Sequence, residues 1–261
     1  MDKNKIRTIL IICVVLVLAI VISVFFNNEE KTYVLKKYDS RTKEKITIEY
    51  IIKNHDTIFH GKFNSYNAKG KKISEGNFVN GHIKGKSIYY FHNGIIESIH
   101  YRKNSKLIVE SIYNYSNGKA RKYLMYDDFG ILDFLITYDE FGNVKNYQGL
   151  PLIEIYQYKI ANKQKFKFKT NQVLKIGDTL KQQYLVANIP NAKRIFKVEN
   201  LNVDNSKVKR TFEQVMPVGI NVKEVLTKAG INKIRAIVKY EFNDNKKTVI
   251  NDTVSFDVKV N

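Results

Sequence analysis

The sequence predicts an all-β protein behind one N-terminal transmembrane helix, with an antiparallel β-meander followed by a β-sandwich. Three observations indicate this class. Residues 6–26 form an apolar run, a turn returns about every twelve residues between 60 and 145, and the later strands are longer and alternate apolar with polar side chains. Tyr (17) and Phe (15) are abundant while Pro (3) is scarce, which suits pleated strands. We expect three parts, residues 1–30, 31–149 and 150–261.

The first part is a candidate membrane anchor. The run from Ile6 to Phe26 has three polar members, Arg7, Thr8 and Ser23. As a helix it is roughly 31 Å long, which matches the hydrocarbon thickness of a bilayer. A cleaved signal peptide is the alternative, but it requires a shorter apolar region and small residues at a cleavage site, which this run lacks. The expected anchor residues are Ile6, Leu10, Val14, Leu18, Val21, Phe25 and Phe26.

The charges on either side of the anchor predict its orientation. Lys3 and Lys5 precede the run, whereas Glu29 and Glu30 follow it. Because the positive side of a span stays in the cytoplasm, we expect a cytoplasmic N-terminus and an extracytoplasmic bulk. The richness in Lys, Asn and Ile is typical of an AT-rich bacterium. The sequence therefore predicts a single-pass protein of a bacterial inner membrane.

The second part repeats an aromatic residue followed three or four positions later by a turn. The aromatic residues are Tyr66, Phe78, Tyr90, Tyr101, Tyr115, Tyr126 and Tyr138. Glycine occupies six turns, at Gly70, Gly81, Gly94, Gly118, Gly130 and Gly142, and Ser105 occupies the seventh. The turn positions step by 11, 13, 11, 13, 12 and 12 residues, which predicts a unit of two hairpins whose glycines adopt positive φ. The recurring glycines disfavour helices here.

The phrases Gly61–Lys71 and Gly85–Gly94 resemble MORN-type repeats, and in particular the variant found in bacterial proteins labelled as toxin–antitoxin antidotes. The resemblance covers residues 55–149. It implies an elongated, twisted sheet used for contact with proteins or lipids, with no catalytic residues to carry over. Ser105, Glu110 and Tyr115 depart from the repeat pattern, and we expect bent or bulged strands in those copies.

The third part predicts about seven strands of a β-sandwich. In the last of them Val254, Phe256, Val258 and Val260 share one face. The other expected strands are Gln182–Ala187, Arg194–Val198, Ile234–Phe242 and Lys247–Ile250, with a hairpin turn at Asn243–Asn245. The stretch from Leu226 to Ala236 is similar to the strand entry of immunoglobulin-like domains, without their Cys or Trp. We expect one or two helical turns over Asn221–Lys228, ended at Gly230.

Motifs of catalysis and metal binding are missing from the sequence. The five histidines lie in the repeat region without metal-ligand spacing, and only His82 and His92 are expected to approach each other if hairpins stack. Two acidic pairs, Asp127–Asp128 and Asp139–Glu140, fall in turns, where Asp binds its own backbone; an acidic ladder is the alternative. No base is expected beside a serine, and no phosphate loop is present. The sequence predicts a non-enzyme without cofactor or metal.

The net charge of +19 bears on the partners. Residues 31–150 contain 20 basic and 12 acidic residues, and residues 151–261 contain 21 basic and 10 acidic residues. Only seven of the 44 basic residues in the chain are Arg. This scarcity of Arg and the predicted topology argue against nucleic acid. We expect a membrane-anchored binding or scaffold protein of the cell envelope, which docks a partner protein through the repeat sheet. The alternatives are a basic surface for an anionic envelope polymer or lipid, and an antidote or immunity protein against a toxin.

Overall fold

The computed structural model describes residues 31–156, 160–162, 167–168 and 174–261. These residues form strands that pair in antiparallel sheets, which confirms the predicted all-β class. The predicted anchor, from Ile6 to Phe26, lies outside the described residues. No helix in the described part of the chain has the length and apolar character needed to cross a bilayer.

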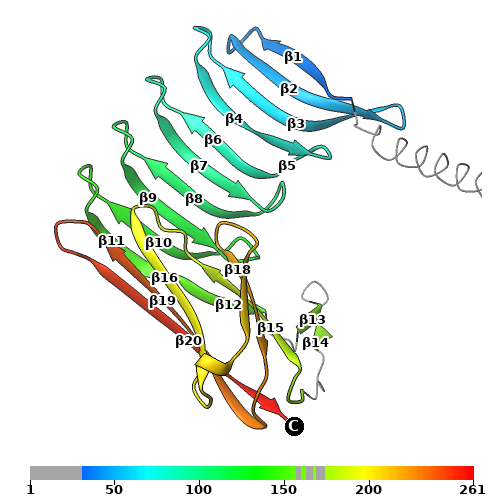
Figure 1. The fold of residues 1–261 in the computed structure, drawn as a ribbon. Coiled ribbons are helices and arrows are strands. Elements are labelled where there is room, and N and C mark those ends of the chain that lie inside the picture. The colour runs from blue at the N-terminus through cyan, green and yellow to red at the C-terminus, as the bar shows by residue number, and fades with distance from the viewer. Residues whose placement is uncertain (1–30, 157–159, 163–166, 169–173) are drawn as a thin grey trace, which may run out of the picture.

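The first eleven strands form one long sheet in which neighbours in sequence are neighbours in space (Figure 1). The strand order is β1-β2-β3-β4-β6-β7-β8-β9-β10-β11, and the short β5 pairs with β4. The strands are β1 (Tyr33–Asp39), β2 (Glu44–Lys53), β3 (Asp56–Tyr66), β4 (Lys72–Val79), β5 (His82–Ile83), β6 (Gly85–Tyr90), β7 (Ile96–Arg102), β8 (Ile108–Asn114), β9 (Ala120–Tyr126), β10 (Leu132–Tyr138) and β11 (Val144–Gly149). Each pair is joined by a short turn, so the sheet is built from local contacts.

Consecutive turns alternate between the two edges of the long sheet. Gly70, Gly94, Gly118 and Gly142 lie in turns at the strand ends along one long side of the sheet, which we call the glycine edge. Gly81, Ser105 and Gly130 lie at the strand ends along the opposite side. The six repeat glycines have φ between 74° and 93°, a conformation that costs other residues free energy. Asn or Asp side chains accept main-chain N–H groups within several turns, and Asp127 and Asp139 each do so twice through Oδ1.

Successive turns of the glycine edge are also bonded to each other. The Asn93 side chain donates to the carbonyl oxygen of Ser116 (3.1 Å), and the Asn117 side chain donates to that of Glu140 (3.1 Å). Lys119 Nζ donates to the Phe141 carbonyl (3.0 Å). Each of these turns is therefore held to the next one along this edge.

A register shift closes several hairpins of the long sheet. Shifts lie beside Tyr66, Tyr90, Asn114 and Tyr138 at the glycine edge, and beside Arg102 and Leu132 at the other edge. Register shifts therefore occur both in the regular copies and in those that contain Ser105 or Tyr115.

The C-terminal residues form two larger sheets and one small one, which we call the C-terminal sheets. Their orders are β12-β15-β18-β17, β16-β19-β20 and β13-β14. The elements are β12 (Leu152–Tyr156), β13 (Ile160–Asn162), β14 (Lys167–Phe168), β15 (Thr179–Val186), β16 (Ala192–Asn200), η2 (Asn205–Lys207), β17 (Arg210–Gln214), β18 (Gly219–Val225), β19 (Gly230–Phe242) and β20 (Val249–Val260). The hairpin of β19 and β20 pairs twelve residues of each strand.

The inward sides of the two larger C-terminal sheets share one core. Alternate residues of β19 from Asn232 to Phe242 are buried, and Tyr184 of β15 meets Phe196 of β16 with ring centroids 5.6 Å apart. The Tyr240 hydroxyl donates to the carbonyl oxygen of Ala187 (2.7 Å). The buried residues of both sheets belong to one hydrophobic cluster, so we describe the sheets as two packed layers.

Two local predictions in this region are wrong. The helical turns expected over Asn221–Lys228 are absent, because residues through Val225 belong to β18. There Ile220, Val222 and Glu224 alternate inward, and pairing with β15 and β17 satisfies the backbone on both sides. The separate strands expected before and after residue 251 are one continuous strand, β20.

Candidate binding surfaces

The long sheet has two faces, which the strand register assigns. From β1 to β10, one row of paired residues on what we call the front face is Lys36, Thr47, Asn64, Glu75, Ile88, Ile99, Ile112, Tyr123 and Ile136. A row on the back face runs through Leu35, Ile48, Phe63 and Gly76 and continues with Ser87, His100, Ser111, Leu124 and Leu135. The front row is polar over β1–β4 and apolar from β6 onward.

The part of the front face formed by β8–β11 lies against the C-terminal sheets. The Tyr138 hydroxyl donates to the Pro190 carbonyl (3.2 Å), and its ring lies 6.4 Å from that of Phe242. Asp244 accepts the main-chain N–H of Val144 (3.3 Å). Phe134, Ile136 and other front-face residues of β9 and β10 are fully buried in the same cluster as the C-terminal core. The front face over β1–β6, which we call the open half, has no such cover among the described residues.

A buried polar junction joins the two parts. Tyr123 donates its hydroxyl hydrogen to Glu110 Oε2 (3.3 Å) and accepts the N–H of Asn188 (2.8 Å). Burial raises the pKa of Glu110 to about 7, although Tyr123, Asn188, Arg194 and Lys86 all favour the carboxylate. Burial also raises the pKa of Tyr123 well above its ordinary value. The carboxyl group therefore changes charge near neutral pH inside the contact.

The back face carries aromatic rings laid over small residues. A Cβ on Gly76 would come within 2.5 Å of Phe63 Cε1, so the Phe63 ring occupies the space above this glycine. Phe63 and Phe78 lie 5.4 Å apart, as do Phe78 and Phe59. The ring of Tyr89 lies 5.6 Å from that of His100. This face, which no described element covers, thus packs its own rings, and Tyr89 and Leu35 stay 37% and 39% exposed.

Sequence reasoning missed a histidine beside two serines on this face. His100 Nδ1 lies 2.8 Å from Ser111 Oγ, and Nε2 lies 3.2 Å from Ser98 Oγ, so the expectation of no base beside a serine is wrong. Burial, with a smaller contribution from Arg102, lowers the pKa of His100. Both serines are buried, at 1% and 5% exposure, and the ring packs edge-on against Tyr113. The group is a packed part of the back face, and the 11 and 13 residue steps were the signal that places these strands together.

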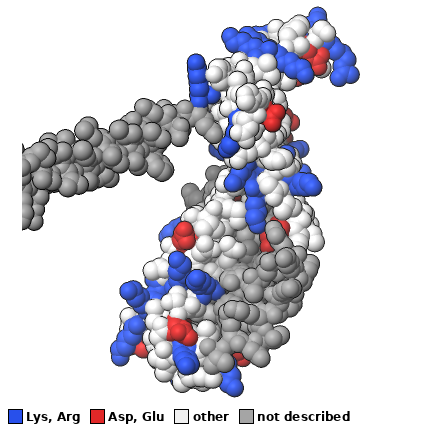
Figure 2. All heavy atoms as spheres, turned by 90° about the vertical axis from the view of Figure 1, so that its right-hand side faces the viewer, with Lys and Arg blue, Asp and Glu red and all other residues white. Residues whose placement is uncertain are grey.

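The charged side chains are spread over the described surface, and the basic ones outnumber the acidic ones on the face shown in Figure 2.

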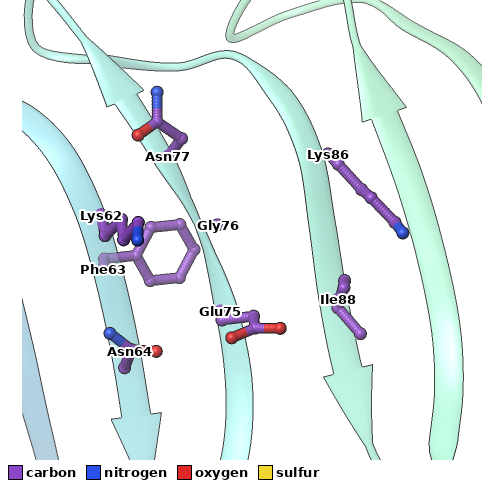
Figure 3. A pocket seen from close by; sticks show the side chains of 8 residues that line it. All are labelled: Lys62, Phe63, Asn64, Glu75, Gly76, Asn77, Lys86 and Ile88. Atoms are coloured by element: carbon purple, nitrogen blue, oxygen red, sulfur yellow. The ribbon is translucent and has the colours of Figure 1, made fainter.

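On the front face the open half contains two hollows. The first, of about 260 Å³, is lined by Lys62, Phe63, Asn64, Glu75, Gly76, Asn77, Lys86 and Ile88 (Figure 3). The second, of about 440 Å³, is lined by Tyr38, Lys43, Lys45, Thr47, Tyr66, Asn67, Ala68 and Gly70.

The carboxylates of this open half are already bonded. Glu75 accepts hydrogen bonds from Lys72 Nζ (2.7 Å) and the Tyr90 hydroxyl (2.6 Å). The Lys72 ammonium and the Tyr90 hydroxyl hold the pKa of Glu75 below its usual value, and burial together with Glu75 raises the pKa of Tyr90 to about 12. Glu49 accepts the main-chain N–H of Lys62 (2.7 Å).

The acidic pairs lie in turns as predicted, and neither the alternative acidic ladder nor the conditional approach of His82 to His92 is formed. Asp127 and Asp139 belong to turns at opposite edges of the sheet, so they make no ladder. His82 and His92 also lie toward opposite edges, separated by the length of β6, which is roughly 20 Å. No group of three or more His, Cys, Asp or Glu within the described ranges is arranged to hold a metal ion.

The predicted repeat aromatics occupy different environments. Tyr138 is fully buried against the C-terminal sheets, Tyr66 lines the second hollow, and Tyr90 bonds Glu75. Asn114 takes the strand position that Tyr66, Tyr90 and Tyr138 take in the other copies, and Tyr115 lies in the turn, where its hydroxyl donates to the Tyr138 carbonyl (2.9 Å). Phe78 lies in the back-face ring cluster, Tyr101 packs beside the core, and Tyr126 pairs with Leu132.

No protein-family model matches the chain, and no curated protein matches it. The surfaces and the sequence are therefore the basis for any functional argument.

Proposed function

We propose that this chain is a non-catalytic binding protein that docks a partner protein on the back face of the long sheet. The observation that carries the proposal is that the sheet is a single layer over β1–β6 in the described chain, with aromatic rings on a face that no described element covers. Partly exposed aromatic side chains supply large contact area at a low cost in conformational entropy, and they are enriched at protein interfaces.

The finer assignments belong to the same proposal. The long sheet is a MORN-type repeat array, and the C-terminal sheets form a β-sandwich that closes one end of its front face. Residues 6–26 anchor the protein in a bacterial inner membrane with its N-terminus in the cytoplasm. The sandwich then serves as a rigid support, because its contact with β8–β11 is extensive and buried.

Photocrosslinking in native membranes tests the docking proposal. A photoreactive amino acid is placed at Tyr89 or Leu35 on the back face, and at Phe212, a 51% exposed residue of the C-terminal sheets, as the control. We expect one dominant protein adduct from the two back-face sites and none of that mass from Phe212. The same adduct from all three sites, or none from the back face, would contradict the proposal. An adduct that proves to be a toxin would identify an antidote.

The repeat turns are poor positions for such a probe. Asn93 and Asn117 have exposed hydrogen bonds, but their side chains hold neighbouring turns together, so replacing them loosens the glycine edge. Tyr89 and Leu35 lie within strands and take no part in these turn-to-turn bonds, so replacing them leaves that edge intact.

A further inference from the structure

Lysine side chains gather on the open half of the front face. Each of the strands β1, β2, β3 and β6 contributes one exposed lysine there, and the register places them in neighbouring rows. These residues, which we call the front lysines, are Lys36, Lys45, Lys62 and Lys86. Since neighbouring strands lie about 4.8 Å apart, the four ammonium groups are distributed along the strand-crossing direction of the sheet.

Hydrogen-bonding side chains lie between the front lysines. Thr47 is paired with Lys36, and Asn77 is paired with Lys62. Asn64 lies between Thr47 and Glu75 in the same row. These groups line the two hollows, so a ligand lying across β1–β6 meets a cation or a polar group on every strand.

The local negative charge is already compensated. Glu75 is bonded to Lys72 and Tyr90, and Glu49 is bonded to a main-chain N–H. Of the four front lysines, Lys86 is close enough to lower the pKa of Glu75, and its effect is smaller than that of Lys72. The open front face therefore keeps a surplus of positive charge, which attracts anions.

The lining of the hollows differs from the back face. Lysines and other polar side chains stand there beside Ile88, Tyr38 and Tyr66, whereas the back face offers clustered phenyl rings. Protein contacts depend on a packed apolar centre. Lysine is a compact point charge on a flexible stem, and it binds phosphate without the fixed fork that arginine supplies. The front face suits a flexible anion with repeated phosphate groups.

We propose that the open front face binds a linear polymer of phosphate groups, which lies across β1–β6 with successive phosphates on the front lysines. The C-terminal sheets lie against the same face further along the sheet, through the contacts of Tyr123 and Tyr138. Anionic vesicles in the test below distinguish lipid headgroups from a polymer as the source of phosphate. The site lies on the opposite side of the sheet from the protein-docking face and stands independently of it.

The test uses the full chain in a non-ionic detergent and end-labelled inorganic polyphosphate, with binding followed by fluorescence anisotropy over a series of NaCl concentrations. One variant carries Lys36→Gln, Lys45→Gln, Lys62→Gln and Lys86→Gln. The matched control removes the same charge from exposed lysines of the C-terminal region, with Lys209→Gln, Lys233→Gln, Lys246→Gln and Lys259→Gln. Circular dichroism melting curves check that both variants are folded.

We expect the front variant to bind about 100-fold more weakly near physiological salt, with a logarithmic salt slope smaller by about 3, because each lost phosphate contact releases about 0.7 fewer counterions. The control should bind within about threefold of the wild-type chain. Equal losses in both variants would show that only the net charge matters and would overturn the proposal. Binding to phosphatidylglycerol vesicles without binding to polyphosphate would assign the phosphate to lipid, and equal competition by polyglutamate would remove the preference for phosphate; either result also overturns it.

Discussion

Replacing Glu110 with Gln should make the protein more stable at alkaline pH. Glu110 is 5% exposed, and burial raises its pKa from 4.5 to about 7. Folding therefore favours the protonated acid, whose stabilising contribution is complete below pH 4.5 and is lost as pH rises through 7. With about 1.4 kcal/mol for each unit of pKa, the free energy of unfolding should fall by about 3 kcal/mol over that window.

Glutamine keeps an oxygen that accepts from Tyr123 but cannot ionise. The variant should thus lack this pH dependence, and at pH 8 it should exceed the wild-type chain by about 3 kcal/mol. The assay is urea unfolding of the full chain in detergent, followed by circular dichroism at pH 4 and pH 8. Other titrating groups are common to both proteins, so the difference between their pH dependences isolates Glu110. Parallel pH dependences would refute the assignment of a buried, late-ionising carboxyl group.

Three further substitutions test the packing. Gly76→Ala should lower the free energy of unfolding by about 1–3 kcal/mol, because the new methyl group meets the ring of Phe63. Chemical denaturation measures this loss, and an unchanged midpoint would show that the ring moves freely aside. Arg210→Met should lower the free energy of unfolding by about 3–5 kcal/mol, because the Glu224 carboxylate, at 1% side-chain exposure, loses its bonds of 2.9 and 2.7 Å to the Arg210 guanidinium. Adding Glu224→Met should restore most of that loss in the same assay. Tyr138→Phe should cost about 1 kcal/mol by removing the hydrogen bond to the Pro190 carbonyl in the loop between β15 and β16. A thermal melt with no shift would contradict that contribution.

The sequence indicates the strands of the long sheet well because its signals are local. A glycine such as Gly94 marks a turn wherever the chain needs positive φ, and the residues between two such turns have room for one strand. The alternation of β20 is similarly local, since Val258 and Val260 point to the core while Lys259 between them is exposed. Such features depend on neighbours a few residues away.

What the sequence does not reveal depends on partners far along the chain. Nothing in the local sequence distinguishes Glu110 from other strand glutamates, because its neighbours Tyr123 and Asn188 come from distant parts of the chain. The turns predicted over Asn221–Lys228 fail because strand neighbours on both sides outweigh local propensity. The sequence does not predict the contact of His100 with Ser98 and Ser111. These serines lie on the same strand and on the adjacent one, and only the strand register shows that Ser111 lies opposite His100.

The bonding of turn to turn along the glycine edge sets the unit by which this molecule can be lengthened or shortened. Asn93 reaches Ser116 and Asn117 reaches Glu140, so the links repeat after two strands and not after one. Removing 24 residues would leave every later strand running in its present direction, with a turn available to receive each link. Removing 12 would reverse the direction of every strand that follows. Whole pairs of strands are therefore the step by which such an array can vary in length while its far end stays correctly placed.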